Sequence, residues 1–145
     1  MAKLRILIVE DSKADVFLIR EAIDLFGINA DIDVLRDGHA ATKYFAAADI
    51  DESAPCPDLI LLDLNLPKAS GDEVLKHQRA SQRCRYAKVL IVSSADAPSD
   101  RATVERLAVA AYFKKPSVYA EFMKLGLIVK ELLSSPGDRQ GVVRR

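Results

Sequence analysis

The strongest constraint on this chain is the regular recurrence of short, branched apolar runs, each followed by polar residues and then by a helical pattern. Continuous apolar runs of this length are typical of strands buried on both faces of a sheet. We therefore predict strands at 4–9, 31–35, 59–62, 88–92 and 111–114. Parallel neighbours need helical crossovers, so this order predicts an α/β fold, a doubly wound sandwich with helices on both faces of the sheet.

Capping residues and apolar periodicity mark the helices. Ser12 begins the first helix, with Asp15 three residues on as its capping-box partner, and Gly27 ends it, while Ser70 begins the third. Residues 46–57 are acidic and contain two prolines, so we predict an extended loop there. The remaining helices are predicted after the Asp37-Gly38 turn through Phe45, over 99–110, and from Ser117 to about Leu133.

Length and composition indicate a single globular domain. The chain has 145 residues, of which 50% are hydrophobic and 29% charged. We expect residues 1–133 to form the domain and 134–145, which show no periodicity, to form a disordered tail. The 21 basic residues equal the 21 acidic ones, which argues against the cationic field of a nucleic-acid-binding protein.

Targeting signals and cysteine usage both favour a cytoplasmic protein. No segment approaches the roughly 18 apolar residues that span a membrane, and the first apolar run is too short for a signal peptide. Cys56 and Cys84 form no CxxC motif, and His39 and His77 are too few to complete a metal cage with them. We predict that both cysteines are reduced thiols without a chemical role.

Polar residues follow four of the predicted strands. Glu10 and Asp11 follow the first, Asp63 the third, Ser93 the fourth and Lys115 the fifth. In open α/β sheets the carboxyl ends of the strands form the ligand site, so these side chains should converge. Three carboxylates in one place repel one another unless a cation binds between them, and oxygen ligands alone favour Mg²⁺ or Mn²⁺. The lysine and hydroxyl opposite them indicate that a phosphoryl group enters the site.

Two residues are candidate acceptors for that group. Ser93 lacks a general base, because neither His39 nor His77 lies near a strand end. Asp63 needs no base, since a carboxylate can attack phosphorus once a metal ion has neutralised the phosphoryl oxygens. The residues therefore favour an aspartyl phosphate at Asp63.

Four sequence blocks carry a resemblance to a known family. ILIVEDS, DLILLDLNLPKASGDEVL, VLIVSS and YFKKP, in this order, resemble the receiver domain of bacterial two-component response regulators, over about residues 4–133. The resemblance implies a flavodoxin-like fold with strand order 2-1-3-4-5. It also implies a signalling protein rather than an enzyme, with self-catalysed phosphotransfer and slow autodephosphorylation as its chemistry.

The resemblance implies a role for each polar residue. Asp63 would accept the phosphoryl group from a histidine of a sensor kinase. Glu10, Asp11 and Asp63 would bind Mg²⁺, for which Mn²⁺ can substitute, together with the backbone carbonyl of Asn65. Lys115 would pair with a phosphoryl oxygen.

Switching residues are implied in the same way. Ser93, in place of the commoner threonine, would donate a hydrogen bond to the phosphoryl group, and Tyr112 would turn inward in response. The Lys115–Pro116 bond is expected to be cis. Ala108 stands where receivers usually have glycine, so we expect the preceding helix to end without a left-handed residue. The missing output domain and the LDLNLPK block resemble the small response regulators that partner bacterial phytochromes, which implies a bacteriophytochrome kinase as partner.

The last predicted helix carries two apolar ridges. One is expected to cover the sheet and consists of Val118, Phe122, Leu125, Val129 and Leu132. The second, Tyr119, Met123 and Leu127, either packs on the fourth helix or is exposed and binds another chain, and we favour an exposed homodimer interface. Phosphorylation would change this surface together with the fourth helix and fifth strand.

Other function classes remain as alternatives. A receiver-like module that binds partners without phosphate is possible, although the complete set of site residues argues against it. A phosphohydrolase with Asp63 as nucleophile would need an aspartate where Asn65 stands. A flavodoxin-like cofactor protein would need a glycine-rich phosphate loop after the first strand.

Overall fold

A single parallel sheet forms the centre of the computed structural model, which describes residues 3–94 and 105–134. Its strands are β1 (Leu4–Val9), β2 (Ala30–Leu35), β3 (Leu59–Leu62), β4 (Lys88–Ser93) and β5 (Ala111–Lys114). They are hydrogen-bonded in the order β2-β1-β3-β4-β5, and every neighbouring pair is parallel. The predicted fold class and strand order are thus confirmed.

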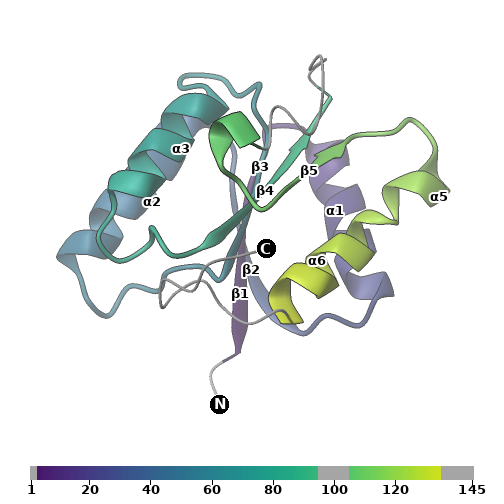
Figure 1. The fold of residues 1–145 in the computed structure, drawn as a ribbon, viewed down its shortest axis with the longest axis horizontal. Coiled ribbons are helices and arrows are strands. Elements are labelled where there is room, and N and C mark those ends of the chain that lie inside the picture. Colours follow the sequence, from purple (N-terminus) through teal and green to yellow (C-terminus); the bar gives the residue numbers. More distant parts are fainter. Residues whose placement is uncertain (1–2, 95–104, 135–145) are drawn as a thin grey trace.

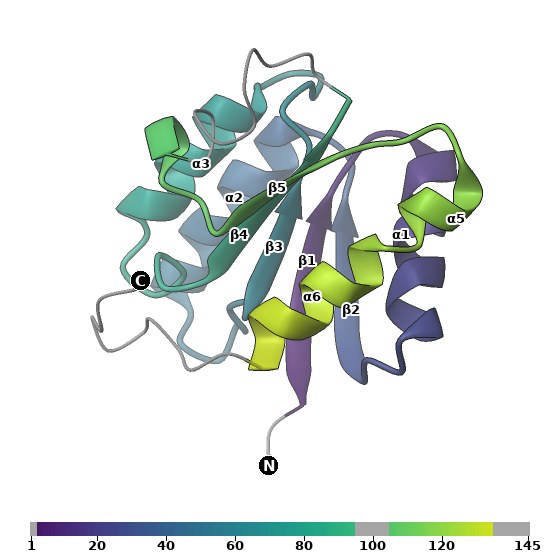
Figure 2. The same ribbon diagram turned by 45° about the vertical axis from the view of Figure 1, so that its right-hand side comes forward.

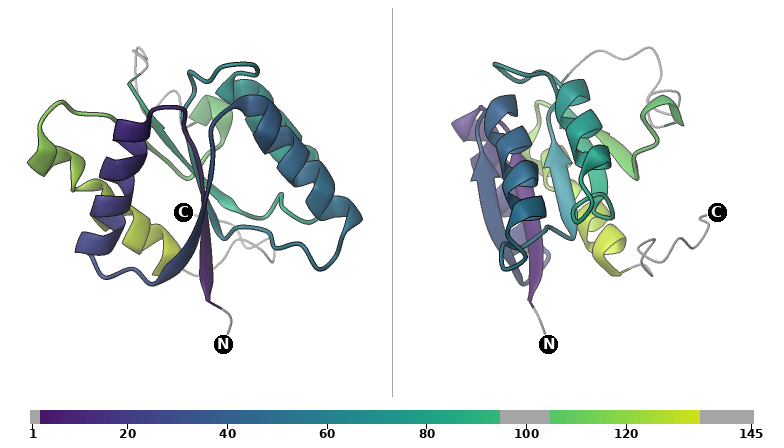
Figure 3. Two further views of the ribbon diagram at one scale, coloured as in Figure 1. Left: turned by 180° about the vertical axis from the view of Figure 1, so that it is seen from behind. Right: turned by 90° about the vertical axis from the view of Figure 1, so that its left-hand side faces the viewer.

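Helices cover both faces of the sheet. On one side lie α2 (Gly38–Ile50) and α3 (Gly71–Ala80), and on the other lie α1 (Lys13–Leu25), α5 (Tyr119–Phe122) and α6 (Leu125–Ser134) (Figure 1). The turned view and the view from behind show the same three layers (Figures 2 and 3).

The alternation of side chains along each strand supplies two cores. In β1, Ile6 and Ile8 belong to the core beneath α1 and α6, whereas Leu7 and Val9 belong to the core beneath α2 and α3. All four side chains are fully buried. A strand with apolar residues on both faces is stable only inside such a three-layer arrangement, which explains why the runs are continuous rather than alternating.

The predicted helix starts are confirmed where a side chain caps the backbone. Ser12 Oγ accepts a hydrogen bond from the Asp15 amide at 3.2 Å, and Ser70 Oγ accepts one from the Glu73 amide at 3.3 Å. Gly27 follows α1 with a φ of 67°, the left-handed conformation that glycine adopts without strain.

The predicted end of the second helix is wrong. The second helix continues to Ile50, so residues 46–50 are helical rather than part of a loop. Alanine is the strongest helix former, and Ala48 is buried against the sheet, so helix formation extends until the chain approaches its prolines. Most of the helix predicted over 99–110 lies outside the described residues.

The last helix is interrupted rather than continuous, and Ser117 does not cap it. Val118 occupies the cap position without a side-chain hydrogen bond, and α6 begins only at Leu125. Phe122, Met123 and Leu125 are all buried. One stripe of a regular helix cannot bury three such closely spaced residues, so the break at Met123 changes the phase of the helix.

Two further backbone expectations are corrected. Ala108 does adopt the left-handed conformation, with a φ of 55°, and its carbonyl accepts a hydrogen bond from Arg79 at 2.9 Å. The helix end is therefore built in the usual way despite the alanine. The bond between Lys115 and Pro116 is trans, as are all peptide bonds of the described residues.

The prediction that both cysteines are reduced thiols is wrong. Cys56 and Cys84 form a disulfide, with 5.3 Å between their Cα atoms. Composition and motif spacing could not reveal this pair, because 28 residues separate the two cysteines and the fold brings them together.

Candidate functional site

The carboxyl ends of the central strands bring the predicted polar residues together. The amide of Asp63 donates to the carbonyl of Val9 at 3.1 Å, which places the ends of β3 and β1 side by side. In the same way the Lys115 amide donates to the carbonyl of Ser93 at 3.0 Å. Backbone pairing alone therefore positions the site.

Three carboxylates form a cluster at this edge. Glu10, Asp11 and Asp63 each present an oxygen atom, and these atoms lie within 4.8 Å of one another. Glu10 and Asp63 are buried, whereas Asp11 is exposed. The cluster therefore opens toward solvent on the side of Asp11.

Lys115 is the cationic group opposite the cluster. Its ammonium lies 2.7 Å from Glu10 Oε1 and 3.3 Å from Asp63 Oδ2. It also contacts Asp15 Oδ2 at 2.8 Å. Four carboxylates thus face one ammonium group, so the fully ionised site carries excess negative charge.

Asp63 is fixed on both oxygens. Its Oδ1 accepts hydrogen bonds from Ser93 Oγ at 2.8 Å and from the Asn65 amide at 3.1 Å, and its Oδ2 contacts Lys115. The Ser93 side chain is completely buried. The carboxylate is therefore held in a single orientation at the base of the site.

Burial disfavours the charged form of Glu10 more than its hydrogen bonds and its ion pair favour it. Burial raises the pKa of Glu10 to about 7, and the charge of Asp63 adds to this rise, although Lys115 and the Ser12 amide oppose it. Burial also opposes the charge of Lys115, but its hydrogen bonds to Asp15 and Glu10 outweigh that effect and raise its pKa.

A divalent cation fits this donor set. Glu10 Oε1 is buried, and its one close polar contact among the described residues is with the Lys115 ammonium at 2.7 Å. An oxygen in this condition has a lone pair available for a metal ion. With only carboxylate oxygens in the cluster, the site suits a hard cation such as Mg²⁺ or Mn²⁺.

Asp15 is a site residue that sequence reasoning missed. It was interpreted only as part of the cap of the first helix, and its amide does bond to Ser12. Its carboxylate, however, points to Lys115. The available signal was its spacing, since Asp15 lies about one helical turn after Asp11.

The remaining predicted residues lie around this centre. Asn65 is exposed directly after β3, and its amide rather than its side chain contacts Asp63. Tyr112 on β5 is half-buried and packs against the core beneath α2 and α3.

The predicted interface ridge is exposed only in part. Tyr119 and Leu127 are each 54% exposed, but Met123 is 5% exposed and belongs to the core, so its assignment to an exposed ridge is wrong. Tyr119 Oη also donates a hydrogen bond to Glu21 at 2.8 Å, which ties α5 to α1. Val118, expected to cover the sheet, is exposed instead.

A buried aspartate lies in an acidic cluster, against a lysine and a hydroxyl, at the carboxyl edge of a 2-1-3-4-5 sheet. This arrangement is typical of a receiver-type signalling domain. The model of the response regulator receiver domain matches residues 6–125, and the chain belongs to this family.

Within this family, the chain is similar to two named response regulators, Rcp1 and RcpA. Response regulator Rcp1 of Synechocystis is 35% identical over 120 residues, which cover 83% of this chain and 82% of Rcp1. The crystal structure of its Mn²⁺-bound form has a TM-score of 0.78 at 32% identity and covers 94% of this chain and 99% of Rcp1. The phosphorylated cyanobacterial phytochrome response regulator RcpA has a TM-score of 0.80 at 32% identity, with 93% and 97% coverage.

Among residues 3–94 and 105–134, none of the helices combines the length and apolarity of a membrane span.

Proposed function

We propose that this receiver domain accepts a phosphoryl group on Asp63 from a histidine kinase in a Mg²⁺-dependent reaction. The observation that carries the proposal is the placement of the Asp63 carboxylate between a cation-binding cluster and the donors Ser93 and Lys115. Every group that an aspartyl phosphate needs for its oxygens therefore surrounds one carboxylate.

The chemistry requires little rearrangement of the site. An oxygen of Asp63 attacks the phosphorus atom, the bond between phosphorus and the kinase histidine breaks, and its electron pair leaves with the imidazole. Mg²⁺ held by Glu10, Asp11 and Asp63, with the Asn65 carbonyl, would neutralise charge on the phosphoryl oxygens. Lys115 then exchanges its contact with Asp63 for one with a phosphoryl oxygen. Slow autodephosphorylation returns the domain to its starting state.

Ser93 and Tyr112 form the proposed switch. The phosphoryl group adds about −1.5 to −2 charges and three acceptors, which attract the Ser93 hydroxyl away from its present bond to Asp63. Tyr112 lies on β5, which pairs with β4, and packs against the core beneath α2 and α3. It can therefore occupy the space that Ser93 leaves. The surface of β5 and its flanking helices changes as a result.

The proposed donor is a sensor kinase of the phytochrome type. This follows from the similarity to RcpA, described as a cyanobacterial phytochrome response regulator, and to Rcp1. A cytoplasmic location belongs to the same proposal, because a kinase that uses ATP operates there. We further propose a homodimer, supported by the exposed Tyr119 and Leu127, and no direct binding of nucleic acid, supported by the balanced charge.

Intact mass after incubation with acetyl phosphate tests the proposal. The wild type should gain one phosphoryl group in the presence of Mg²⁺ and none in EDTA. Asp63→Asn should gain none, whereas Asp58→Asn, its matched control at the opposite end of β3, should behave as the wild type. An unmodified wild type, or a modified Asp63→Asn variant, would refute the proposal.

A further inference from the structure

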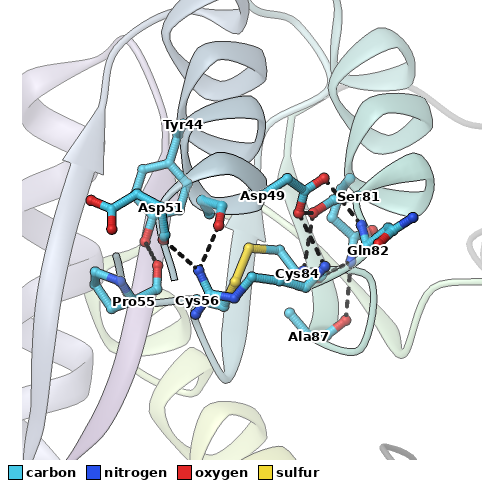
Figure 4. Close-up of a disulfide and its surroundings, with 12 residues drawn as sticks. Tyr44, Asp49, Asp51, Pro55, Cys56, Ser81, Gln82, Cys84 and Ala87 are labelled. Carbon is cyan, nitrogen blue, oxygen red and sulfur yellow. Dashed lines mark hydrogen bonds between the residues drawn. A yellow bond between two sulfur atoms is a disulfide. The ribbon is translucent and has the colours of Figure 1, made fainter. Parts of the chain in front are cut away.

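The disulfide lies at the edge of the sheet opposite the phosphoacceptor site. Cys56 precedes β3 and Cys84 precedes β4, whereas Asp63 follows β3 and Ser93 ends β4. The bond joins the α2–β3 loop to the turn between α3 and β4 (Figure 4). The two cysteine residues differ in exposure, since Cys84 is 1% exposed and Cys56 is half-buried.

The turn that carries Cys84 is held in place without the disulfide. Asp49 near the end of α2 accepts hydrogen bonds from Ser81 Oγ at 2.7 Å and from the amides of Gln82 and Arg83, each at 3.1 Å. The Ser81 hydroxyl in turn accepts a bond from the Cys84 amide at 3.0 Å. Figure 4 shows Asp49 directed at this turn.

Two further side chains brace the same turn. Gln78 is buried and donates to the carbonyl of Cys84 at 2.9 Å, and Arg83 donates to the carbonyls of Ala48 and Asp51. Breaking the disulfide therefore leaves Cys84 where it is.

The loop that carries Cys56 has few other attachments. Among the described residues, the one hydrogen bond from 52–57 to another element is that of the Pro55 carbonyl with Tyr44 Oη, at 3.3 Å. Residues 51–53 and Pro55 are exposed, while Ala54 and Cys56 pack at the margin of the core. The disulfide thus attaches the middle of this loop to the fold, whereas the Arg83 bond to the Asp51 carbonyl and the buried Pro57 hold its two ends.

We propose that Cys56–Cys84 is a reversible thiol–disulfide exchange site whose reduction releases the α2–β3 loop. In the cytoplasm, the location proposed above on which this inference rests, a disulfide is exposed to thiol reductants and is more often redox-responsive than permanent. The reductant is a dithiol and the oxidant a disulfide of the glutathione class.

The exposure difference fixes the order of steps. A thiolate of the dithiol attacks Sγ of Cys56, which belongs to the more exposed of the two residues, and the Cys84 sulfur leaves and takes up a proton. The second thiol of the reductant then attacks the mixed disulfide and releases the Cys56 thiol. Two electrons pass to the protein, and the reductant becomes a disulfide. The chain would then carry a redox input separate from its phosphoryl input.

The experiment compares oxidised and dithiothreitol-reduced full-length protein. Alkylation without prior reduction should add no group to the oxidised form and two groups to the reduced form, and oxidised glutathione should restore the first result. Reduction should raise amide hydrogen exchange in residues 51–57 but not in β1. Because the closed loop spans 28 residues, reduction should lower the unfolding temperature by about 10 °C.

Cys56→Ser is the control variant. It should resemble the reduced wild type and show no response to dithiothreitol. Two alkylated thiols that oxidised glutathione cannot protect, or identical exchange of 51–57 in both redox states, would overturn the proposal. Acetyl phosphate labelling of both states should be equal, and it reports on the proposed function independently of the redox result.

Discussion

Neutralising one carboxylate of the acidic cluster should make the domain more stable than the wild type without Mg²⁺, and less stable than the wild type with Mg²⁺. Asp11→Asn is the informative change, because Asp11 is the exposed member of the cluster and no lysine contact to it is found among the described residues. Its carboxylate lies within 4.8 Å of both Glu10 and Asp63. Two unit charges at that distance in water repel by about 0.9 kcal/mol.

At pH 8.5, above the pKa of about 7 that burial gives Glu10, two such repulsions, partly screened by salt, amount to about 1 kcal/mol. In EDTA, Asp11→Asn should therefore unfold about 3 °C above the wild type. With Mg²⁺ at one hundred times its dissociation constant, the wild type gains about 2.7 kcal/mol, or about 8 °C, because the ion binds only the folded state. The variant lacks a metal ligand and should gain far less, so the order of stability reverses.

Thermal unfolding in EDTA and in MgCl₂ measures both effects. Glu52→Gln, a neutralised acid in the exposed α2–β3 loop, is the matched control and should follow the wild type in both buffers. The reasoning fails if Asp11→Asn is less stable than the wild type in EDTA, or if Mg²⁺ stabilises the two proteins equally.

Two further changes test the packing of the scaffold, each by urea unfolding. Ala108→Gly should stabilise the domain by about 1 kcal/mol, because Ala108 has a φ of 55° and glycine adopts that conformation without steric cost; a destabilised variant would contradict the assignment. Gly126→Ala should destabilise it by about 1–3 kcal/mol, because an added Cβ would overlap the Phe26 ring and the carbonyl of Ala22; unchanged stability would show that α1 and α6 do not pack as described.

The sequence was sufficient for the sheet and for most of the site. Apolar runs define strands that are buried on both faces, and parallel topology forces the residues after those strands to one edge. For that reason Glu10, Asp63 and Ser93 were predictable from local pattern and a general rule about strand ends.

Features that depend on tertiary contacts were not predictable in this way. Asp15 was assigned only to a helix cap, because its ion pair with Lys115 joins residues 100 positions apart. The packing of α2 and α3 brings Cys56 and Cys84 together, and this contact cannot be predicted from the spacing of the two cysteines in the sequence. A regular helix would place Met123 on the exposed side, whereas the chain breaks between α5 and α6 and buries Met123 beside Phe122 and Leu125.

The identity of the phosphorylated residue is the most direct test of the proposed function. Borohydride reduces an aspartyl phosphate to homoserine, so peptide mass mapping after reduction identifies the acceptor. Protein treated with acetyl phosphate and Mg²⁺ should contain homoserine at position 63 and at no other aspartate. Homoserine at Asp11 or Asp15, or a borohydride-resistant phosphate on Ser93, would contradict the assignment of Asp63.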